Sequence, residues 1–135
     1  MKEIVLKAKE SNIDIATEFV ESLLRDAGCS DNDRALLDIA LDELFCNIAR
    51  YAYGNNDGNV TVRFEFDEKE KTAAVTLIDS GIPFDPLKKK DPDITLSAED
   101  RKIGGLGIYM VKNIMDAVEY KYEDGHNIIR IIKKI

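Results

Sequence analysis

The order in which helix-like and strand-like segments follow one another limits the fold of this chain more than any other feature. Apolar residues that recur every three or four positions predict helices, and apolar residues that alternate with polar ones predict strands. Strands are expected in this way at about 3–9, 59–67, 72–79, 118–123 and 127–133, and helices at about 12–27, 30–53 and 106–116. Helices and strands that occur in groups favour an α+β fold. We therefore expect a two-layer α/β sandwich, with a mostly antiparallel mixed sheet and the helices on one face.

Capping residues mark the expected ends of the first two helices. Ser11 or Asn12 can cap the first helix, and Gly28 can follow its C-cap. Ser30 or Asp31 starts the second helix. The two helices are therefore joined by a very short connection.

A long polar stretch at 80–103 separates the central strands from the third helix. It contains all three prolines and many charges, with one helical turn expected near Ser97–Arg101. A stretch of this length without regular structure is usually functional in a compact domain.

Length and charge limit the class of protein. A chain of 135 residues is expected to form a single domain, spanning 1–135. Its net charge of −7 argues against a general attraction to nucleic acids or anionic membranes. The sequence shows no secretory signal or apolar run of about 20 residues, and Cys29 and Cys46 form no CxxC motif. These features predict a cytoplasmic protein with reduced thiols.

The second helix carries a polar stripe beside its apolar face. Glu43, Asn47 and Arg50 are spaced i, i+4, i+7 and fall within about 60° of one another on the helix. Together they offer a proton acceptor, an oxygen ligand for a hard cation and a cation for phosphate. Taken alone, the same stripe also fits a solvated helix edge.

A carboxylate follows the apolar strand at 72–79. Asp79 can accept a hydrogen bond from an exocyclic amine such as that of adenine, and Gly81 allows close approach of a base or an unusual backbone angle. On its own, Asp-Ser-Gly at a strand end is more often a simple turn.

Three glycines in four positions precede the third helix. Gly104, Gly105 and Gly107 can bring backbone N–H groups to an anion at the helix N-terminus, and Arg101 and Lys102 lie just upstream. The spacing fits neither the dinucleotide-binding GxGxxG nor the Walker GxxxxGK[ST]. Phosphate binding is the favoured interpretation, with a structural glycine turn as the alternative.

The order of these segments resembles the GHKL (Bergerat-fold) ATPases. The resemblance rests on ELFCNIARYAY at 43–53, DSGIPFDP at 79–86 and GGLGIYMVKNIMD at 104–116, and it extends over nearly the whole chain. Within that family the chain is most similar to the bacterial anti-sigma-factor serine/threonine kinases.

The resemblance implies a role for each segment. Glu43 is expected to be the general base, Asn47 to hold Mg²⁺, and Asp79 to bind the adenine amine beside Gly81. Arg50 is expected to contact phosphate. The segment around the glycines is expected to bind ATP through Arg101, Lys102, Gly104, Gly105, Leu106 and Gly107. Residues 86–103 are expected to form a lid.

One motif departs from the family pattern. Many relatives have Gly-Thr before the last strand, whereas this chain has Gly125, His126 and Asn127. The hydroxyl contact behind the adenine pocket is therefore in question, although Asn127 could partly replace it. His126 is expected to be a turn residue and not a phosphoacceptor, which argues against a sensor histidine kinase.

Two functions of different classes follow. The first is a protein-serine kinase that binds Mg·ATP, phosphorylates a STAS-type anti-anti-sigma protein and captures a sigma factor, with a homodimer also compatible with the resemblance. The alternative is an ATP-binding regulatory module without catalysis. Glu43 favours the kinase, because a protein that only binds a nucleotide needs no general base. A fragment of a larger GHKL protein is a third, less favoured hypothesis.

Overall fold

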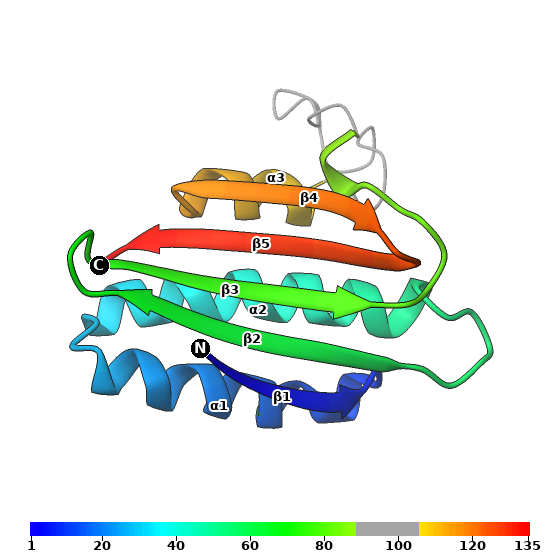
Figure 1. Cartoon of the computed structure of the whole chain (residues 1–135), viewed down its shortest axis with the longest axis horizontal. Helices are drawn as coiled ribbons and strands as arrows, with labels where there is room; N and C mark the ends of the chain where they lie inside the picture. The colour runs from blue at the N-terminus through cyan, green and yellow to red at the C-terminus, as the bar shows by residue number, and fades with distance from the viewer. Residues whose placement is uncertain (89–105) are drawn as a thin grey trace.

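The computed structural model describes residues 1–88 and 106–135. Five strands and three α-helices form two layers, and Figure 1 shows the sheet in front with all three helices behind it. The helical elements are η1 (Glu10–Asn12), α1 (Ile13–Asp26), α2 (Asp31–Tyr51), η2 (Pro86–Lys88) and α3 (Leu106–Ile114), and the strands are β1 (Lys2–Lys7), β2 (Asn59–Asp67), β3 (Thr72–Asp79), β4 (Ala117–Glu123) and β5 (His126–Lys134).

The strands form one sheet in the order β1-β2-β3-β5-β4. All four pairs of neighbours are antiparallel, so the sheet goes further than the mostly antiparallel arrangement that we expected. The predicted α+β sandwich is confirmed. The expected helical turn near Ser97–Arg101 lies outside the described residues.

The core lies between the sheet and the helices. Alternate residues of β2 point into it, and Val60, Val62 and Phe64 are buried. They pack in one cluster with Leu41 and Phe45 of α2. Each fully buried side chain of this kind contributes about 1.5–3 kcal/mol, so the core fixes α2 against the sheet.

Residues next to the helix ends determine where α1 ends and where α2 begins. Gly28 has φ +83° directly after the C-cap of α1, as expected. The side chain of Ser30 caps α2 by accepting a hydrogen bond from the Asp33 amide at 3.2 Å. Asn12 occupies the N-cap position of α1 but makes no cap bond; its Nδ2 donates to the Lys7 carbonyl at 2.9 Å instead.

Candidate functional site

A cavity of about 300 Å³ opens between α2, α3 and the end of β3. Its lining is mainly apolar, with three polar side chains, Asn47, Asp79 and Asn127, and the hydroxyls of two tyrosines. The complete lining is Leu44, Asn47, Ile48, Tyr51, Ala52, Asp79, Ile82, Phe84, Pro86, Ile108, Tyr120, Asn127 and Ile129. An apolar cavity with few convergent polar groups is typical of a small-molecule site.

Asp79 is the buried carboxylate of this cavity, with 5% of its surface exposed. Its Oδ1 accepts hydrogen bonds from the Gly81 amide at 2.9 Å and from Nδ2 of Asn127 at 3.0 Å. Within the described part of the chain, Oδ2 receives no hydrogen bond. A ligand amine that enters the cavity therefore finds one free acceptor, which fits the edge of an adenine ring.

Gly81 is required by protein packing. A Cβ atom at this position would lie 2.2 Å from the Ala52 carbonyl oxygen at the end of α2. The same carbonyl accepts a hydrogen bond from the Ile82 amide at 2.9 Å. The glycine lets the loop after β3 pass against α2, and the close approach of a base to Gly81, which the sequence suggested, stays a prediction.

Tyr53 fixes the same corner, and no sequence pattern had indicated this role. Its hydroxyl accepts a hydrogen bond from the Ser80 amide at 2.8 Å and donates to the Asn59 carbonyl at 2.5 Å. The end of α2, the start of β2 and the end of β3 are thereby joined beside Asp79.

Glu43 and Asn47 lie together on α2, as their spacing predicted. Nδ2 of Asn47 donates to Oε1 of Glu43 at 3.3 Å. Gly107 of α3 is close by, because a Cβ atom there would lie 2.0 Å from the same Oε1. The Glu43 carboxylate thus lies against the N-terminal turn of α3, where a helix dipole favours negative charge.

Arg50 has another partner. Its Nε donates to Oε1 of Glu10 in η1, and its side chain is 56% exposed. It is not among the residues that line the cavity. Contact between Arg50 and a phosphate therefore stays a prediction, and it requires the guanidinium to leave Glu10.

Only part of the expected phosphate site, the start of α3, lies within the described residues. Leu106 is the first residue of α3 and Gly107 the second. The other members that the sequence predicts, Arg101, Lys102, Gly104 and Gly105, lie outside the described residues, as does most of the expected lid at 86–103.

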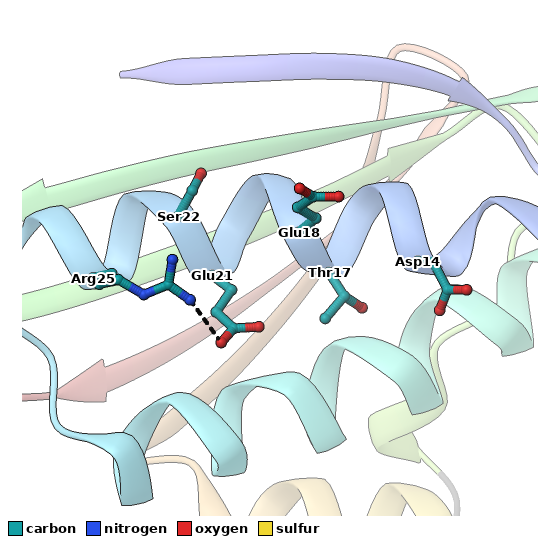
Figure 2. A pocket seen from close by; sticks show the side chains of 6 residues that line it. All are labelled: Asp14, Thr17, Glu18, Glu21, Ser22 and Arg25. Carbon is teal, nitrogen blue, oxygen red and sulfur yellow. Dashed lines mark hydrogen bonds and ion pairs between the residues drawn. The ribbon is translucent and has the colours of Figure 1, made fainter.

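A second hollow of about 270 Å³ lies on the surface of α1 (Figure 2). Asp14, Glu18 and Glu21 supply three carboxylates, and its one cation, Arg25, already pairs with Glu21 at 3.2 Å. Such a surface repels an anion, so the hollow does not compete with the cavity at Asp79 as a nucleotide site.

No group of three or more His, Cys, Asp and Glu side chains gathers as a metal site within 1–88 and 106–135. Mg²⁺ commonly uses one or two protein oxygens together with substrate phosphates, so the amide oxygen of Asn47 at the cavity edge is a suitable single ligand. None of the described helices is both long and apolar enough to span a bilayer.

Comparison with known proteins decides the family. A model described as the histidine kinase-like ATPase domain matches residues 6–133. The chain belongs to this family. This ATPase domain is also 29% identical over 129 residues to the serine-protein kinase RsbW of Listeria monocytogenes, with 92% of the chain and 81% of the relative covered. For RsbW of Bacillus cereus the identity is 26% over 131 residues, with coverages of 94% and 81%. The predicted resemblance to GHKL ATPases is confirmed, and these relatives are serine-protein kinases.

Proposed function

We propose that this protein is a Mg·ATP-dependent protein-serine kinase with one domain over residues 1–135. Its substrate would be a STAS-type anti-anti-sigma protein, and a sigma factor would be a second partner in the cytoplasm. The observation that carries the catalytic part is the position of Glu43, whose carboxylate lies beside Asn47 and the start of α3. The family and the serine-protein kinases among its relatives support the choice of reaction.

The residues divide the work between binding and transfer. Asp79 would accept a hydrogen bond from the adenine amine through Oδ2, and the apolar walls would exclude water from the base. Asn47 would hold Mg²⁺, which neutralises phosphate charge when bound. Gly107 and the glycines before it would offer backbone N–H groups to the phosphates.

Glu43 would act on the protein substrate. It would accept the proton of a serine hydroxyl while the serine oxygen forms a bond to the γ-phosphorus. The bond between that phosphorus and the β–γ bridging oxygen breaks, and ADP leaves with the electron pair. Such transfer depends mainly on position and charge neutralisation, and a general base adds about 10²–10⁴-fold.

The competing function is an ATP-binding regulator that transfers no phosphate. Both functions need Asp79 and Asn47, but only the kinase needs the carboxylate of Glu43. A glutamine at this position keeps the size of the side chain and its contact with Asn47, and removes the base. Glu43→Gln therefore separates the two hypotheses.

The test incubates the protein and a STAS-domain protein with γ-labelled Mg·ATP. We expect the wild type to label the STAS protein, and Glu43→Gln to lower the rate about 10²–10⁴-fold while ATP affinity stays within about threefold. Glu65→Gln, which changes an exposed carboxylate of β2, is the matched control. If the wild type binds ATP and labels neither protein, the kinase is wrong and the regulator remains. If it binds neither ATP nor ADP at millimolar concentration, both are wrong.

A further inference from the structure

Asn127 lies behind the carboxylate of Asp79 and is almost completely buried, with 6% of its surface exposed. It is the second residue of β5, and the sheet register places it directly opposite Asp79 of β3. The pair is therefore fixed by the backbone of two neighbouring strands.

The Asn127 amide uses every hydrogen bond that it can make. Its Nδ2 donates to Asp79 Oδ1 at 3.0 Å and to the Ile82 carbonyl at 2.9 Å. Its Oδ1 accepts from the Phe84 amide at 3.1 Å and from the Tyr120 hydroxyl. Two donors and two acceptor positions are the full capacity of an amide side chain. Asn127 thus has no group left for a ligand, and any effect on binding must act through a neighbour.

The backbone partners also determine which way the amide faces. The Phe84 amide can only donate, so it must meet the oxygen, and the Ile82 carbonyl can only accept, so it must meet the nitrogen. A flipped amide would set its nitrogen against the Phe84 N–H donor and its oxygen against two acceptors, the Asp79 carboxylate and the Ile82 carbonyl. The side chain is therefore held with an N–H group toward Asp79.

We propose that Asn127 is the positioning residue that orients Asp79 for recognition of an exocyclic amine. With Oδ1 held by Asn127 and the Gly81 amide, the carboxylate keeps Oδ2 available to the ligand. The inference rests on the proposed function, because it concerns how the same cavity selects its base.

A threonine hydroxyl at this position could not make the same set of bonds. A hydroxyl has one donor and cannot reach both Asp79 and the Ile82 carbonyl. The asparagine of this chain therefore joins the base-selecting carboxylate to the segment 82–84 directly.

The experiment compares the dissociation constants of ATP and of purine riboside triphosphate, which lacks the exocyclic amine. A hydrogen bond between an amine and a buried carboxylate predicts that the wild type prefers ATP by about 10–100-fold. In Asn127→Ala the carboxylate loses one of its two N–H donors, and we expect the preference to fall to about threefold or less. Thr76→Ala, a buried polar residue of β3 outside the cavity, is the control, and its preference should match the wild type.

The ratio of the two constants separates positioning from a structural effect. If both nucleotides bind more weakly to Asn127→Ala by the same factor, the residue only supports the fold, and the inference is wrong while ATP binding stands. If the wild type binds neither nucleotide, the proposed function fails and the inference with it. Should Asn127→Ala not fold, Asn127→Leu takes its place, because leucine has about the same size and no donor for Asp79, and an unchanged preference in that variant also overturns the inference.

Discussion

Replacing Gly107 by alanine places a methyl group where the Glu43 carboxylate now lies. The added Cβ atom would be 2.0 Å from Oε1 and 2.7 Å from Oε2. Because non-bonded atoms prefer about 3.5 Å, the carboxylate must retreat by about 1–1.5 Å. A displacement of about 1 Å at a catalytic group can lower a rate about 100-fold. We therefore expect Gly107→Ala to lower phosphotransfer by about that factor.

The same change should affect stability little. Alanine in a helix is up to about 1 kcal/mol more favourable than glycine. Forcing Glu43 from its preferred conformation costs about 0.5–1.5 kcal/mol, so the net change in unfolding free energy stays within about 1 kcal/mol. Thermal melting measures this term, and single-turnover transfer to a STAS protein measures the rate.

A double-mutant cycle shows whether Glu43 transmits the effect. In Glu43→Gln the proposed general base is already absent, so adding Gly107→Ala should lower the rate by less than about threefold. A wild-type rate in Gly107→Ala alone, or independent effects of the two changes, would show that Gly107 does not act through Glu43.

Two further substitutions are tested by their effect on the stability of the fold. Gly81→Ala sets a Cβ atom 2.2 Å from the rigid Ala52 carbonyl, so we expect a loss of about 1–3 kcal/mol in chemical denaturation together with weaker ATP binding; a variant as stable as the wild type would contradict the packing. Burial and the nearby Glu21 raise the pKa of Asp38 from 3.8 to about 6, against the opposite effect of Arg34. The folded state then holds the proton of the Asp38 carboxyl more tightly than the unfolded state does. The wild type therefore gains stability relative to Asp38→Asn as the pH falls from 7 to 4. Asp38→Asn should therefore be more stable than the wild type at pH 8. The difference in unfolding free energy is at most about 3 kcal/mol, or about 1–2 kcal/mol after solvent screening, and it should disappear between pH 6 and 4. Melting curves at several pH values measure this difference, and a difference that does not change with pH excludes this cause.

Sequence patterns predict the fold where one face of an element meets the core. The alternation of Val60, Val62 and Phe64 predicted β2 because the helices cover only one side of the sheet. The end of α2 was harder to predict. Ala52 and Tyr53 continue the apolar pattern, but the Ala52 carbonyl bonds the Ile82 amide and Tyr53 bonds Ser80, thirty and twenty-seven positions away. Such tertiary partners leave no local trace in the sequence.

The site divides in the same way. Glu43 and Asn47 could be placed together because helical spacing alone makes them neighbours. The contact of Asp79 with Asn127 depends on the register of β3 against β5, which joins residues 48 positions apart. The sequence could suggest that Asn127 replaces a hydroxyl, but the complete set of bonds requires the positions of Ile82, Phe84 and Tyr120.

Arg50 shows why a shared helical stripe does not define a shared site. On α2 the cavity wall is formed by Leu44, Asn47 and Tyr51, whereas Arg50 extends toward η1 and pairs with Glu10. The pair is exposed, and exposed pairs contribute only about 0–1 kcal/mol. A triphosphate carries more charge than one carboxylate and could therefore draw Arg50 from Glu10. The partner of Arg50 is then decided by competition between two anions, which depends on the ligand as well as on the helix.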